Sequence, residues 1–104
     1  THFDEKAMTT EMTKKFIDAY KKKYNEDPSA FAALGFDAYL VIIDAINRAK
    51  SVKPADVKDA LAKTKNFQGA TGNITFDENG DAIKDAIVKK IEKGSFKFIS
   101  IVKP

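Results

Sequence analysis

The chain has 104 residues, a length that suits one small domain. Its hydrophobic (43%) and charged (32%) fractions exclude a fully disordered or low-complexity chain, and its net charge is only +3. The absence of cysteine excludes disulfides, thiolate metal sites and a cysteine nucleophile. His2 is the only histidine, so we expect neither a histidine-based catalytic triad nor a zinc site.

The basic residues do not have the character of a nucleic-acid-binding surface. Of the 18, only Arg48 is an arginine, whereas forked recognition of phosphate and guanine relies on arginine. The lysines are interleaved with Asp and Glu along most of the chain, as on a solvated surface. We therefore expect no nucleic-acid partner.

No segment has the pattern of a leader or a membrane span. Residues 1–6 are polar apart from Phe3 and no apolar run follows them, so we expect no signal peptide at this end. The longest apolar stretch, residues 30–46, contains Asp37 and Asp44, each of which would cost on the order of 3 kcal/mol near a bilayer centre. We therefore expect this stretch not to cross a membrane.

A first amphipathic helix is predicted by apolar residues that recur every four positions: Met8, Met12, Phe16, Tyr20 and Tyr24. Thr9 or Thr10 is a suitable N-cap, and Pro28 prevents the helix from continuing. The Met and Tyr stripe is interpreted as a core face, with a ligand-facing surface as the alternative.

A second helix is predicted over about residues 30–50, with Ser29 as its N-cap. Three charged residues, Asp37, Asp44 and Arg48, fall on one narrow strip of it, and we expect that strip to be solvated. Acid–base chemistry by the two carboxylates is the less economical alternative. Nearly everything else on this helix is apolar, which indicates that it needs cover on most of its circumference.

A third, short helix beginning at Pro54 is predicted by apolar residues on one face up to Thr64, and the period then changes to that of strands. We expect a turn at residues 67–72, a short strand at 73–76, a hairpin turn around the Asn79-Gly80 pair, and strands at about 86–92 and 96–102. The fold class expected for the chain is α+β, three helices followed by a hairpin and two strands.

Two loop motifs have alternative interpretations. Asp77, Asn79 and Asp81 resemble the first positions of a calcium loop, but Ala82 and Val88 occupy the positions that require Gly and Glu, so a hairpin turn is favoured. The GATG sequence at residues 69–72 resembles the phosphate-clamping loop of KH-type RNA-binding modules, but it contains no basic residue and a strand follows, so a simple turn is favoured.

Four segments in order resemble one known family: FIDAYKKKY at 16–24, PSAFAALGFDA at 28–38, FQGATG at 67–72 and ITFDENGD at 74–81. They are similar to the C-terminal part of the substrate-binding proteins of branched-chain amino-acid ABC transporters, and the resemblance covers nearly the whole chain. The family usually has Tyr where this chain has Phe36, a departure that removes one hydroxyl.

The resemblance implies a segment of a two-lobed, Rossmann-like α/β binding protein about three times this length. It assigns residues 7–66 to the first lobe, residues 67–82 to a crossing segment with its hairpin, and residues 83–104 to strands returning to the second lobe. It further implies an extracytoplasmic location, in the periplasm or lipid-anchored at the cell surface, an amino-acid ligand and a membrane permease as partners, and neither enzymatic activity nor a cofactor.

One ligand contact carries over from the family to this segment, Phe31 near the start of the second helix, where similar proteins place an aromatic ring against the ligand side chain. The equally plain alternative is that Phe31 belongs to the core. No catalytic or metal-binding residue is expected. Because the second helix and the final strands lack cover, we expect the isolated chain to self-associate, most simply by exchanging elements. The alternative to the family interpretation is a self-contained α+β structural or interaction domain.

Overall fold

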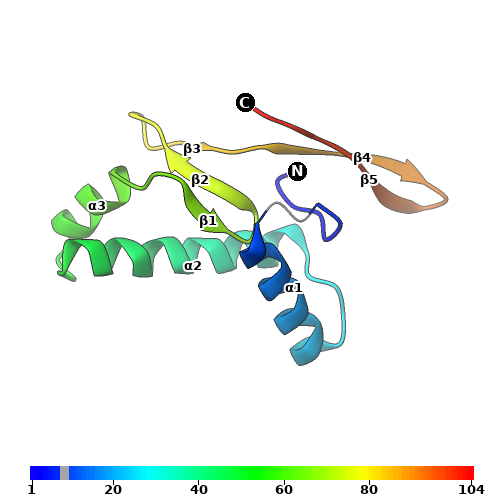
Figure 1. Cartoon of the computed structure of the whole chain (residues 1–104), viewed down its shortest axis with the longest axis horizontal. Helices are drawn as coiled ribbons and strands as arrows, with labels where there is room; N and C mark the ends of the chain where they lie inside the picture. Colours follow the sequence, from blue (N-terminus) through cyan, green and yellow to red (C-terminus); the bar gives the residue numbers. More distant parts are fainter. Residues whose placement is uncertain (8–9) are drawn as a thin grey trace.

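A computed structural model describes residues 1–7 and 10–104. Three helices are followed by short antiparallel strands, as the sequence predicts (Figure 1). The elements are α1 Glu11–Tyr24, α2 Ala30–Ala49, α3 Pro54–Ala62, β1 Phe67–Gly69, β2 Gly72–Phe76, β3 Ala82–Ile83, β4 Ala86–Glu92 and β5 Ser95–Val102.

The helix ends follow the predicted capping residues. The Thr10 hydroxyl accepts a hydrogen bond from the Thr13 N–H (3.2 Å) at the start of α1, and the Ser29 hydroxyl accepts one from the Ala32 N–H (3.1 Å) at the start of α2. Thr9, the other candidate cap, and Met8 lie outside the described residues. Asn25 ends α1 in the left-handed conformation, so the helix stops before Pro28.

The strands form two separate antiparallel sheets, one with the order β1-β2-β3 and one with the order β4-β5. The predicted strands at 73–76, 86–92 and 96–102 are confirmed. The prediction of a turn over all of residues 67–72 is wrong for residues 67–69, because these form β1 and pair with β2 from Phe67↔Ile74 to Gly69↔Gly72. Only Ala70 and Thr71 remain as the turn.

The small core lies where the N-terminal segment, α1, α2 and the β1–β2 turn meet. Phe16 of α1 packs against Phe3 (ring centroids 6.1 Å apart) and against Phe36 of α2 (4.8 Å), while Ala33 and Ala70 close the contact between α2 and the turn. Along the described part of the predicted stripe, Phe16 is core and Met12 and Tyr20 pack partly buried against it, but Tyr24 is 54% exposed.

Much apolar surface remains uncovered. The accessible surface is 7319 Å² and the radius of gyration 15.0 Å, against roughly 5,800 Å² and about 13 Å for a compact protein of this size. On α2 the exposed side chains include Phe31, Tyr39, Ile42 and Ile43. By length and composition alone α2 could cross a membrane, but core helices meet the same criterion, and the middle of α2 is hydrogen-bonded to the β1–β2 turn.

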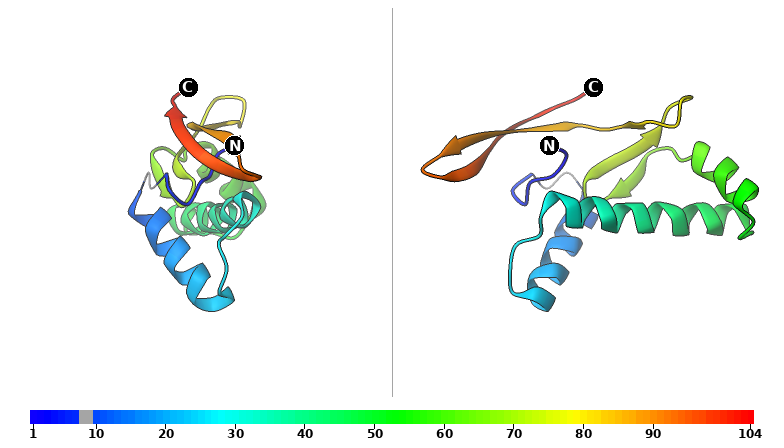
Figure 2. Two further views of the ribbon diagram at one scale, coloured as in Figure 1. Left: turned by 90° about the vertical axis from the view of Figure 1, so that its right-hand side faces the viewer. Right: turned by 180° about the vertical axis from the view of Figure 1, so that it is seen from behind.

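The β4–β5 ribbon projects from the helices (Figure 2). Its exposed apolar residues include Val88, Ile91, Phe96 and Ile99. Its described backbone partner outside the ribbon is the first residue of the chain, since the Ile87 N–H donates to the Thr1 carbonyl (2.7 Å). Lys89 also forms an ion pair with Asp4 (3.1 Å). Residues 1–4 thus join the ribbon to the helical part, since Phe3 packs against Phe16 of α1.

Candidate functional site

Phe31, the residue predicted to contact a ligand, stands in the first turn of α2. Its ring is 86% exposed, so it does not belong to the core that the described residues form. The Ser29 cap holds the helix end beside it. The structure therefore presents Phe31 as an aromatic surface at a helix N-terminus, available to a ligand or to a further part of the protein.

Asp37, two turns further along α2, is the most enclosed charged residue of the described chain, with 3% of its surface exposed. Its carboxylate accepts hydrogen bonds from the Ala70 N–H (2.7 Å), the Thr71 N–H (2.8 Å) and the Thr71 hydroxyl (2.6 Å). The prediction that Asp37 lies on a solvated strip is wrong, because the β1–β2 turn folds back onto this face and supplies the donors that a buried carboxylate requires.

The same turn is held from its other side by α1. The Thr10 hydroxyl donates to the Gly69 carbonyl (2.7 Å), and the buried Thr13 hydroxyl donates to the Ala70 carbonyl (2.9 Å). A Cβ atom at Gly69 would lie 2.6 Å from the Asp37 carboxylate, so this position has no room for a side chain. The turn is therefore bound through its carbonyls to α1 and through its N–H groups to α2.

Lys84, in the connection between β3 and β4, completes this cluster. Its Nζ donates to the Thr71 hydroxyl oxygen, which itself donates to Asp37. Burial lowers the pKa of Lys84 below its ordinary value of 10.5, while the nearby Asp37 charge acts in the opposite direction. The sequence alone did not single out Lys84. The one available signal for the cluster was Asp37, because a carboxylate within an otherwise apolar helix requires a partner.

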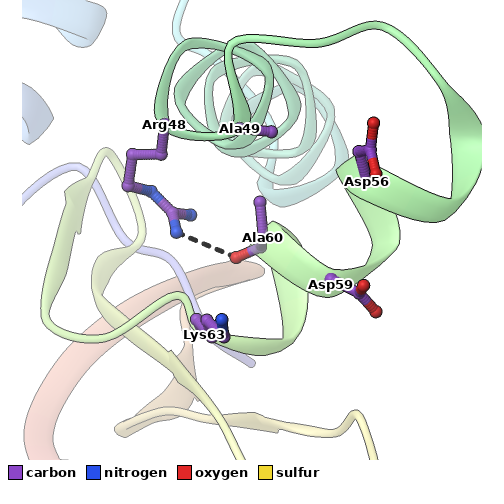
Figure 3. Close-up of a pocket in the computed structure, with 6 residues that line it drawn as sticks. All are labelled: Arg48, Ala49, Asp56, Asp59, Ala60 and Lys63. Atoms are coloured by element: carbon purple, nitrogen blue, oxygen red, sulfur yellow. Dashed lines mark hydrogen bonds between the residues drawn. The ribbon is translucent and has the colours of Figure 1, made fainter.

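The other charged residues of the predicted strip have a different role. Arg48 lines a cleft of about 280 Å³ beside α3 (Figure 3). It pairs with Asp44 (2.9 Å) and donates to the Ala60 carbonyl and the Thr64 hydroxyl, both at 2.9 Å. Because these bonds hold the end of α3 against α2, Arg48 acts here as a structural residue.

The loop at residues 77–81 is the hairpin turn that the sequence favours over a calcium site. The Asp77 carboxylate accepts hydrogen bonds from the N–H groups of Asn79 and Asp81, both at 2.9 Å. The described residues contain no group of three or more potential metal ligands of the His, Cys, Asp or Glu type. The GATG motif likewise forms the β1–β2 turn, whose hydrogen bonds are made within the chain.

Comparisons with known sequences identify one family. The sequence profile of the periplasmic binding protein family matches residues 1–95. The leucine-, isoleucine-, valine-, threonine- and alanine-binding protein of Pseudomonas aeruginosa is 42% identical over 69 residues, which are 65% of this chain and 18% of that protein.

Solved structures agree. A leucine-binding protein from Thermotoga maritima superposes over the whole chain with a TM-score of 0.93 and 45% identity. A branched-chain amino acid transporter substrate-binding protein from Streptococcus pneumoniae, solved with isoleucine, superposes with a TM-score of 0.88 and 36% identity. The chain spans 30% and 29% of these two proteins.

The described fold is thus part of a larger binding-protein fold, and the family is one of binding proteins, not of enzymes. The family's name implies an extracytoplasmic location. The chain belongs to the periplasmic binding protein family and is homologous to the branched-chain amino-acid-binding proteins of ABC transporters.

Proposed function

We propose that this chain is part of a solute-binding protein that captures a branched-chain or related amino acid and delivers it to an ABC importer. The observation that carries the proposal is the likeness to the Thermotoga maritima leucine-binding protein, at 45% identity and a TM-score of 0.93 over the whole chain. The permease is then the membrane partner, and the protein works in the periplasm or anchored at the cell surface.

We assign residues 7–66 to the first lobe, 67–82 to a crossing segment and 83–104 to the second lobe. Two features support this division. The ribbon projects from the helical part and pairs with the N-terminal residues. The crossing segment holds the turn that α1 and α2 bind.

We further propose that Phe31 forms one wall of the amino-acid pocket between the lobes. Its ring is exposed at the end of a helix whose other exposed apolar residues lie along its length, and no residue of the described core covers it. An aromatic ring in that position suits an aliphatic ligand side chain, because the contact removes apolar surface of both partners from water.

Calorimetry on the full-length protein with leucine, isoleucine and valine tests the function. We expect saturable binding of at least one of them, and no binding to any of the three would contradict the proposal.

The Phe31→Ala variant tests the site. We expect it to weaken binding by about 1 to 3 kcal/mol, because it removes a large apolar wall from a small pocket. Tyr39→Ala is a matched control, since Tyr39 is another exposed aromatic residue of the same helix (64%). Unchanged affinity in Phe31→Ala, with an intact circular dichroism spectrum, would remove Phe31 from the pocket.

A further inference from the structure

Lys84 stands at the junction of the two parts of the chain. On one side are the helices with β1–β3, and on the other is the β4–β5 ribbon. Residues 1–4 contact both parts, because Phe3 packs against Phe16 while Thr1 and Asp4 bind the ribbon. Residues 84 and 85 form the connection between β3 and β4, and Figure 1 shows the chain passing from one part to the other along this extended stretch. A contact made by Lys84 therefore acts on the link between the two parts.

The contacts of Lys84 lead to a rigid part of the molecule. Its Nζ donates to the Thr71 hydroxyl, and the same hydroxyl donates to the buried Asp37 carboxylate of α2 (2.6 Å). The turn that contains Thr71 is also fixed to α1 by Thr10 and Thr13. The two-residue connection is thereby tied, through one lysine, to a turn that two helices hold.

Burial of a lysine at this position carries a cost in stability. Lys84 is half-buried, and burial lowers its pKa because the charged form loses hydration. A methionine of similar length would fill the same space next to Ile74, Phe76 and the other apolar residues of the cleft that Lys84 lines, without that cost. The charge serves the hydrogen bond to Thr71 and also lies near the buried Asp37 carboxylate, which opposes the effect of burial on the pKa of Lys84.

We propose that Lys84 is a positioning residue: its hydrogen bond to Thr71 sets the angle at which the β4–β5 ribbon leaves the helical part, and through that angle the affinity for the solute. The second half of this statement rests on the proposed function, in which the solute is held between two lobes. The Lys84–Thr71 hydrogen bond changes the affinity for the solute only if it is stronger in one arrangement of the lobes than in the other. It then favours the arrangement in which it is made.

The test uses the full-length protein with spin labels at Asn47→Cys on α2 and Ser95→Cys at the start of β5, both exposed positions. Electron–electron double resonance without ligand reports the distance between the two parts. The variants are Lys84→Met, which removes the donor and keeps the chain length, and Lys84→Arg, which restores a donor. Lys90→Met is the control, since Lys90 is an exposed lysine of β4. Leucine calorimetry and thermal unfolding accompany each variant.

In Lys84→Met we expect a shifted or broadened distance distribution and a leucine affinity about fivefold weaker, the scale of losing one hydrogen bond that favours one state. The melting temperature falls as well, because the buried Asp37 loses a nearby positive charge. The distance distribution and the affinity are therefore the two quantities that a merely stabilising lysine would leave unchanged. Lys84→Arg returns both quantities toward the wild type, and Lys90→Met leaves them unchanged.

A wild-type distance distribution in Lys84→Met overturns the proposal, as does a lowered melting temperature with the distribution unchanged. Failure of the unmodified protein to bind leucine, isoleucine or valine would contradict the proposed function, while the distance measurement, which needs no ligand, would still decide the role of Lys84.

Discussion

The β1–β2 turn and the β4–β5 ribbon differ in how far the described chain covers them. The turn is two residues long, and two helices and Lys84 bind it through backbone and side-chain hydrogen bonds. The ribbon has fifteen residues in its two strands, yet Ile91, Phe96 and Ile99 are all more than half exposed.

The difference shows which parts of this fold are self-sufficient. Buried polar groups must be paired or the fold loses several kcal/mol, so the chain supplies partners for Asp37 itself. Apolar strand faces can be left for another surface to cover. Here the accessible surface exceeds that of a compact protein by roughly 1,500 Å², about twice the roughly 800 Å² that one partner buries in a standard interface.

The largest effect is expected when the ribbon is left without its cover. The isolated 104-residue chain is expected to self-associate at micromolar concentration, most simply as a dimer that exchanges strands, because unpaired strand edges and apolar faces then cover one another. Light scattering should give about twice the mass of one chain. Ile91 and Phe96 are paired across the ribbon, so changing both to Lys should shift the mass toward the monomer. A monomer with sharp two-state unfolding, in the unmodified chain, would show that the ribbon needs no cover.

The next largest effect is expected from a substitution of Asp37, whose carboxylate accepts the hydrogen bonds of the β1–β2 turn. Asp37→Ala leaves the N–H groups of Ala70 and Thr71 buried without acceptors, and we expect a loss of about 3 kcal/mol in the free energy of unfolding. Urea unfolding of the full-length protein measures it. The matched control is Asp44→Ala on the same helix, which removes a half-exposed ion pair with Arg48 and should cost less than about 1 kcal/mol. Equal losses in the two variants would mean that the turn network contributes no more than a surface pair.

A smaller effect, with opposite signs at two glycines, is expected from added methyl groups. Gly69→Ala places a Cβ atom 2.6 Å from the Asp37 carboxylate and should destabilise the protein by about 2 kcal/mol. Gly35→Ala, within α2, meets nothing within 4 Å and should stabilise it by about 0.5 to 1 kcal/mol through helix propensity. Thermal unfolding of both variants gives the comparison, and a neutral Gly69→Ala would show that the turn can move away from α2.

The smallest effect concerns the pH dependence of stability at Lys84. Because burial lowers its pKa in the fold, the unfolded chain binds more protons than the folded chain at pH values between that lowered pKa and 10.5. The contribution of Lys84 to stability therefore increases as the pH rises through this window. Subtracting the pH profile of Lys84→Met from that of the unmodified protein isolates the contribution, and a difference that falls with rising pH would contradict the assignment.

The sequence by itself was sufficient for the local elements and for the family. Four-residue periodicity with a cap at Thr9 or Thr10 predicted α1, and the Ser29 cap followed by a long apolar stretch predicted α2. Both predictions succeed because helix formation depends on residues within one or two turns. Two runs with the period of strands, separated by Lys93-Gly94-Ser95, predicted β4 and β5. The order of four motifs was sufficient to identify the binding-protein family that the comparisons show.

The tertiary structure alone decided where Asp37, β1, β3 and Lys84 lie. Asp37 has a charged residue's preference for water, and only the return of a turn 33 residues further along the chain makes its burial possible. The three residues of β1 and two of β3 are too few to show a strand period, and β2 between them fixes both. Lys84 meets Thr71 across 13 residues of chain, a distance at which residue pattern carries no information and only the packing of β3 beside β2 brings the two side chains together.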